Sequence, residues 1–72
     1  MDDEALRAFG ERIRALRNKR GVSQEQFAAE CRLDRTYVSG IERGKRNPSL
    51  RNIKRIAKVL EVTLSQLFKG LG

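Results

Sequence analysis

The sequence predicts an all-α fold of five short helices in a single domain spanning residues 1–72. Three observations carry this prediction. Apolar residues recur at helical spacing, residues that cap helix starts precede most of these segments, and no segment has the pattern of a credible strand. A chain of 72 residues buries only about 60% of its unfolded surface. We therefore expect a thin core and added stabilisation by a partner, such as a second copy of the chain.

The first predicted helix covers residues 3–19. Acidic side chains at its start and basic side chains at its end suit the helix dipole, and Gly21 ends the helix. Its apolar residues are spaced by 3, 4 and 3 positions and share one face: Leu6, Phe9, Ile13 and Leu16.

Two shorter helices follow, separated by a brief turn at residues 32–33. Ser23 caps the first of them, and Gln26, three residues later, gives the pattern of a capping box. Asp34 caps the next helix, and Gly44 ends it. Both helices are therefore predicted to be only about two turns long.

A fourth helix over residues 49–60 and a fifth that opens at Thr63 complete the predicted fold. Thr63 and Gln66 have the pattern of a second capping box. The residues of the fourth helix that we expect to face inward are Leu50, Ile53, Ile56, Ala57 and Leu60.

Charge is distributed unevenly along the chain. The net charge is +7, and the stretch from Arg32 to Lys58 holds nine basic but only two acidic residues, so it carries the entire excess. A concentrated basic surface indicates a polyanionic partner. The alternative is a solvated face that only keeps the protein soluble.

The sequence lacks the residues that most catalytic and metal sites need. It contains no histidine, a single cysteine and no glycine-rich phosphate loop. We therefore predict no enzyme activity, no metal site and no cofactor, and we expect Cys31 to be a small apolar filler. No apolar run reaches 18 residues and the start is acidic rather than basic, which predicts a soluble, cytoplasmic protein without a membrane contact.

The second and third predicted helices have the lengths and spacing of a helix-turn-helix motif. With Gln24, Ala28, Val38, Ile41 and the string SGIERGKRNPSL, nearly the whole chain resembles the repressor-like Cro/phage-repressor helix-turn-helix family. The stretch LDRTYVSGIERG further resembles the controller proteins of bacterial restriction–modification systems. The chain departs from the family at Arg32, where glycine is usual, and a left-handed backbone there would cost about 1 kcal/mol.

The resemblance implies that the third helix is the recognition helix, which lies in the major groove of DNA. Arg35 could donate two hydrogen bonds to a guanine, and Thr36 and Ser39 suit a base or a phosphate, so we predict all three as base-reading residues. Gly40 has no side chain, and we predict that it allows close approach to the DNA. The alternative for Gly40 is tight packing between helices.

Contacts to the DNA backbone are predicted at Arg17, Gln24, Tyr37, Arg43, Lys45, Arg46 and Asn47. Tyr37 could instead pack against the core, and Arg46 could enter the minor groove. Arg17 and Glu42 match positions that the repressor family pairs, so we expect an ion pair that also leaves Arg17 near a phosphate. The alternative is two unrelated surface charges.

A dimer interface is predicted near the C-terminus. Helix-turn-helix proteins dimerise to place two recognition helices one DNA turn apart. The chain has more apolar residues in this region than a core of its size can enclose. We expect a two-fold homodimer on the fourth and fifth helices through Val59, Leu64, Phe68 and Leu71.

The resemblance as a whole implies a transcriptional regulator that binds a near-palindromic double-stranded DNA operator as a homodimer. It also implies control of the regulator's own gene and of a restriction endonuclease gene, in the cytoplasm at the bacterial nucleoid, with RNA polymerase as a further candidate partner. Two alternatives stay open. One is a phage-type repressor or antitoxin with the same fold. The other is a helical adaptor for an acidic protein, which would tolerate charge-preserving changes at Arg35.

Overall fold

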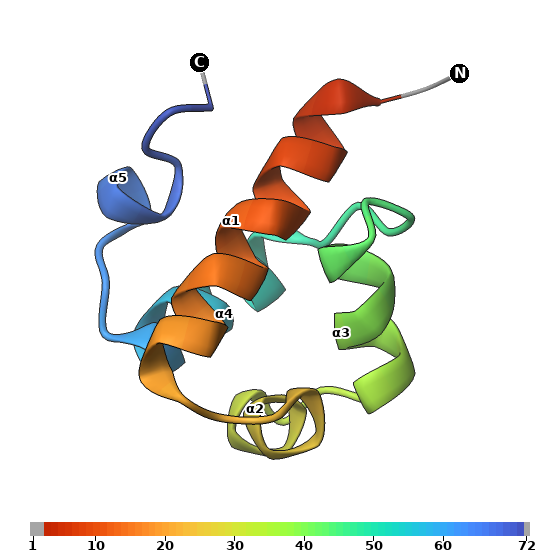
Figure 1. The fold of residues 1–72 in the computed structure, drawn as a ribbon, viewed down its shortest axis with the longest axis vertical. Coiled ribbons are helices and arrows are strands. Elements are labelled where there is room, and N and C mark those ends of the chain that lie inside the picture. The colour runs from red at the N-terminus through yellow and green to blue at the C-terminus, as the bar shows by residue number, and fades with distance from the viewer. Residues whose placement is uncertain (1–2, 72) are drawn as a thin grey trace.

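The computed structural model describes residues 3–71 and confirms the all-α fold (Figure 1). Its helices are α1 (Glu4–Arg20), α2 (Gln24–Cys31), α3 (Arg35–Glu42), α4 (Leu50–Leu60) and α5 (Leu64–Leu67), and no strand forms among the described residues. α3 and α5 lie on opposite sides of α1 (Figure 1). The fold therefore has room for two separate contact surfaces. None of the helices within residues 3–71 combines the length and apolar character that crossing a membrane requires.

Each helix begins at a side chain that accepts a hydrogen bond from a backbone N–H of the first turn. In α5, Thr63 Oγ1 accepts from the N–H of Gln66 at 3.0 Å and Gln66 Oε1 accepts from the N–H of Thr63 at 2.8 Å, so the predicted capping box forms. In α2, Ser23 Oγ accepts from the N–H of Gln26 at 3.0 Å. A cap of this kind is worth about 1 kcal/mol, a large share of what a short helix needs. The N-cap residues are Asp3, Ser23, Asp34, Ser49 and Thr63.

The turn between α2 and α3 contains Arg32, for which the sequence analysis considered a left-handed backbone. Arg32 has φ 59° and ψ 41°, and the N–H of Leu33 donates to the carbonyl of Ala28 at 2.9 Å. Glu61 closes α4 with the same backbone angles. Both helices thus end in a left-handed conformation that normally favours glycine. The hydrogen bonds of the turn hold Arg32 and Glu61 in this conformation although both have side chains.

Every helix contributes at least one fully buried side chain to the core, and α2 and α3 contribute two each: Ile13, Phe27, Cys31, Val38, Ile41, Ile56 and Leu67. Cys31 is buried at the end of α2, as predicted. Burial, and to a smaller extent the charge of Glu30, raises the pKa of the Cys31 thiol to about 11. The thiol therefore stays protonated at neutral pH and behaves as an apolar filler.

Gly10 brings α1 into close contact with the end of α3. It is buried in the middle of α1, and a β-carbon at this position would run into the carbonyl oxygens of Ile41 and Glu42. The two helices can approach this closely only because no side chain stands between them.

The prediction that Leu50 faces inward is wrong. Leu50 is 66% exposed, whereas Ile56, Ala57 and Leu60 are buried and Ile53 is partly buried. The apolar stripe of α4 that meets the core begins at Ile53. Leu50 is the first residue of the helix and extends beyond the core.

Candidate nucleic-acid interface

α2 and α3 form a helix-turn-helix whose inner side is part of the core. Phe27 and Ala28 of α2 and Val38 and Ile41 of α3 are all buried in the same cluster. This packing fixes the angle between the two helices and determines which residues of α3 face outward. The start of α3 is therefore exposed to solvent, while its inner side is fixed by the core.

The N-terminal end of α3 displays two of the predicted base-reading residues. Arg35 and Thr36 are exposed, and Ser39, one turn later, is partly buried. Asp34 Oδ2 accepts from the backbone N–H of Thr36 at 2.9 Å, which fixes the helix start. Among residues 3–71, the side chains of Arg35, Thr36 and Ser39 take part in no hydrogen bond or ion pair within the protein. Their functional groups are available to a partner.

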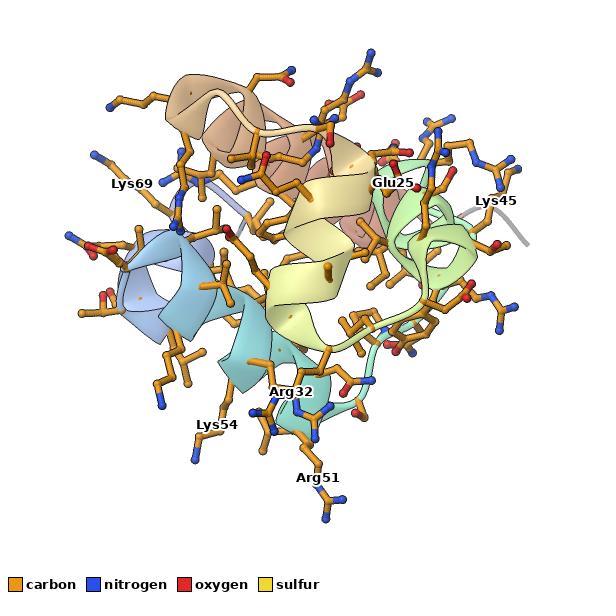
Figure 2. The ribbon with its side chains drawn as sticks, turned by 90° about the horizontal axis from the view of Figure 1, so that it is seen from below. Glu25, Arg32, Lys45, Arg51, Lys54 and Lys69 are labelled. Carbon is orange, nitrogen blue, oxygen red and sulfur yellow. The ribbon has the colours of Figure 1, made fainter. Side chains whose placement is uncertain are left out.

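The loop after α3 presents a group of polar side chains, most of them basic, beside α3. It turns at Gly44, which has φ 73°, and the N–H of Lys45 donates to the carbonyl of Gly40 at 2.8 Å. Figure 2 shows Lys45 beside α3, on the side of the molecule opposite Lys69. The exposed residues of this group are Arg43, Lys45, Arg46 and Asn47.

Gly40 is buried, which differs from the open position that we expected. A β-carbon at position 40 would lie 2.5 Å from Cγ of Arg46, because the Arg46 side chain runs across this part of α3. The missing side chain of Gly40 therefore makes room for Arg46 within the protein. The sequence did not indicate that Arg46 occupies this space, and the close approach of Gly40 to DNA stays a prediction.

Tyr37 is packed and also hydrogen-bonded. Its side chain is partly buried against the core, and its hydroxyl accepts a hydrogen bond from Asn52 Nδ2 of α4 at 3.1 Å. The guanidinium carbon of Arg46 lies 5.8 Å from the centre of its ring. The structure therefore shows the alternative in which Tyr37 packs against the core. Because the hydroxyl oxygen only accepts in this bond, the hydroxyl can still donate a hydrogen bond to a phosphate.

The predicted ion pair between Arg17 and Glu42 forms inside the protein. Arg17 Nε and Nη2 donate to the two carboxylate oxygens of Glu42 at 2.7 and 3.1 Å, and Arg17 Nη1 donates to the carbonyl of Val22 at 2.8 Å. Gln24 Nε2 donates to Glu42 Oε1 at 2.9 Å. This network ties α1, the start of α2 and the end of α3 together.

The network changes the expected role of Arg17. Its side chain is only 10% exposed and that of Glu42 only 2% exposed. Arg17 is thus held mostly inside the protein by Glu42, and its contact with a phosphate stays a prediction. Gln24 is partly buried, and its amide orients Glu42, a contact that the sequence did not indicate.

A second basic surface lies on α4. Figure 2 shows Arg51 and Lys54 on α4 and Arg32 at the end of α2 pointing from the same edge of the molecule. Arg55 and Lys58 are also exposed on α4. The excess positive charge is therefore divided between the loop after α3 and the outer side of α4.

Two of the predicted dimer residues, Leu64 and Phe68, belong to α5 and its end, and α5 lies on the other side of α1 from α3 (Figure 1). Leu64 is 38% and Phe68 41% exposed, while Val59 and Leu71 are partly buried. The Phe68 ring stacks on Phe9 of α1 with ring centres 5.2 Å apart. Leu64 and Phe68 are thus exposed apolar residues at α5, whereas Val59 lines a hollow with Cys31 and Arg55, and Leu71 lines another with Pro48.

The fold and the exposed start of α3 define a helix-turn-helix protein, and a family model described as "Helix-turn-helix" matches residues 13–67. The chain is 50% identical over 72 residues to Control protein C.MunI of Mycoplasma sp, covering 99% of this chain and 96% of that one. The crystal structure of the restriction–modification controller protein C.AhdI from Aeromonas hydrophila has a TM-score of 0.89 and 47% identity, covering 92% of this chain and 100% of that one. The chain belongs to the helix-turn-helix controller proteins of restriction–modification systems.

A related protein has also been solved with DNA. C.Esp1396I bound to a 19 base pair DNA duplex has a TM-score of 0.86 and 38% identity, with 96% of this chain and 92% of that chain covered. The resemblance stated from the sequence is therefore confirmed.

Proposed function

We propose that this protein is a transcriptional regulator that binds a near-palindromic operator and controls its own gene and a restriction endonuclease gene. The observation that carries the proposal is the exposed start of α3 beside the basic loop at residues 43–47. A relative with the same fold binds a DNA duplex. Arg35 and Thr36 would reach base edges in the major groove, and the loop would contact the DNA backbone. RNA polymerase is the further partner through which such a regulator would act on transcription.

The bound form in this proposal is a two-fold homodimer. The exposed apolar surface of α5 supports it, because a monomer would leave Leu64 and Phe68 in water. A dimer built there would carry α3 of each protomer on the side away from the partner. Two recognition helices about 34 Å apart would then meet successive turns of the major groove.

Selection of bound duplexes from a random DNA pool tests the proposal. We expect the wild-type protein to enrich a two-fold symmetric motif with half-sites about one turn apart. In Arg35→Ala, loss of the guanidinium should weaken binding by about 1–3 kcal/mol per half-site and relax the preference at one base pair in each. Arg35→Lys keeps the charge but not the two-pronged geometry, so it should also lose that preference.

The opposite results are equally informative. If the wild-type protein enriched no sequence, DNA reading would be rejected and the adaptor for an acidic protein would come first. If Arg35→Lys retained the full preference, Arg35 would be a backbone contact rather than a base contact.

Sedimentation of Leu64→Glu and Phe68→Glu variants tests the dimer. A buried, unpaired carboxylate opposes association, so both variants should sediment as monomers at micromolar concentrations where the wild type is dimeric. Ala15→Glu places the same charge on an exposed position of α1 and is the control. Phe68 also stacks on Phe9 within the protomer, so the Leu64 variant gives the cleaner result. A dimeric Leu64→Glu protein would show that the interface lies elsewhere.

A further inference from the structure

The side chain of Arg46 lies across the recognition helix at Gly40. Its Cγ would be 2.5 Å, and its Cβ and Nε each 3.6 Å, from a β-carbon at that position. Gly40 is buried although it lies on the outer side of α3, and Arg46 is the side chain that covers it. Any residue other than glycine at position 40 would displace the Arg46 side chain from this path.

Two further contacts fix the same arrangement. The guanidinium carbon of Arg46 lies 5.8 Å from the Tyr37 ring centre, and a guanidinium over an aromatic face is an attractive pair. Tyr37 is itself held through its hydroxyl by Asn52 of α4. The backbone of the loop is fixed as well, because the N–H of Lys45 donates to the carbonyl of Gly40. Residues 37 and 40 are one helical turn apart and so form one continuous surface for Arg46.

We propose that Gly40 is a positioning residue that acts on DNA binding through Arg46. This inference depends on the proposed function, in which Arg46 contacts the operator. Because Gly40 has no side chain, Arg46 can rest across α3 and against Tyr37 before DNA arrives. The arginine side chain then loses less conformational freedom on binding, which strengthens the complex. Gly40 does not need to touch the DNA for this effect.

The substitution Gly40→Ala separates this role from a structural one. Alanine is a better helix former than glycine, and the only contact at issue is with a flexible side chain, so the melting temperature should be unchanged or raised. Operator affinity should nevertheless fall by roughly twofold to twelvefold per half-site, the range expected for the ordering of one long side chain.

The test is a double-mutant cycle with Gly40→Ala and Arg46→Ala on the operator obtained from the selection experiment. We expect Gly40→Ala to weaken binding in the wild-type background and to have no effect when Arg46 is already alanine. The matched control is a cycle with Lys45→Ala, the neighbouring exposed basic residue, where the two effects should add.

A second measurement needs no DNA. Tyr37 is the single tyrosine and the chain contains no tryptophan, so the near-ultraviolet circular dichroism of tyrosine reports only on this ring. Gly40→Ala and Arg46→Ala should change that signal in the same way, and Lys45→Ala should leave it as in the wild type. An unchanged signal in Gly40→Ala would mean that Arg46 is not displaced, and the inference would be rejected.

Three binding results would overturn the inference. The first is an equal loss from Gly40→Ala with and without Arg46, which would mean that the added methyl group meets the DNA itself. The second is no loss from Gly40→Ala in the wild-type background, and the third is no loss from Arg46→Ala. Failure of the proposed function looks different, because the wild-type protein would then enrich no operator and the cycle would have no starting point.

Discussion

Replacing Glu42 with alanine should lower the free energy of unfolding by about 3–5 kcal/mol, because it leaves the buried positive charge of Arg17 without a negative counter-charge. Glu42 accepts two hydrogen bonds from Arg17 and one from Gln24, and its side chain is only 2% exposed. Chemical denaturation followed by circular dichroism at 222 nm measures the change. The same substitution should also weaken DNA binding, because the network joins α1 and α2 to the end of α3.

The double variant Arg17→Met, Glu42→Leu is the control for this prediction. It removes both charges and fills the space with apolar groups, so it should be less destabilised than Glu42→Ala alone. If Glu42→Ala lowered the free energy of unfolding by less than about 1 kcal/mol, Arg17 and Glu42 would be behaving as a solvated surface ion pair, contrary to their burial.

Gly10→Ala should be the second strongly destabilising change, with a loss of about 3 kcal/mol or more from overpacking. The added methyl group would meet the backbone carbonyls of Ile41 and Glu42, which cannot rotate away as a side chain can. α1 would have to move away from α3 and loosen the core contact between them. Thermal unfolding of the variant measures the loss.

The matched control for Gly10→Ala is the reverse substitution at an exposed position of the same helix. Ala15→Gly should cost about 1 kcal/mol through helix propensity alone. Propensity predicts a gain for Gly10→Ala, so a loss larger than that of Ala15→Gly can come only from the contact with α3. A Gly10→Ala variant as stable as the wild type would mean that the helices separate without cost.

The local features of the fold were predictable from the sequence because their causes act within a few residues. Ser23, Asp34 and Thr63 cap helices by bonding to backbone groups two or three residues ahead. Arg32 could be expected in a left-handed turn because the family resemblance indicates a glycine there. Leu50 shows the limit, since periodicity gives the side of a helix that a residue occupies but not where the core under that helix ends.

Contacts between distant segments were predicted less well. The pair of Arg17 and Glu42, 25 residues apart, was expected only from the resemblance. The burial of Arg17 depends on how three helices pack. The bond from Asn52 to Tyr37 and the path of Arg46 over Gly40 depend on a loop that turns back on α3. The spacing of residues along the sequence does not predict where such a loop places its side chains.

The side chains predicted to read bases contribute no bond to the folded protein. Within residues 3–71, the side chains of Arg35, Thr36 and Ser39 make no hydrogen bond or ion pair. The residues that maintain the fold, such as Gly10, Arg17 and Glu42, are different ones. Substitutions at the exposed positions 35 and 36 should therefore change the folding stability little. If these residues read bases as proposed, a controller protein with this architecture could change its target sequence while keeping its scaffold, and so diverge together with its operator.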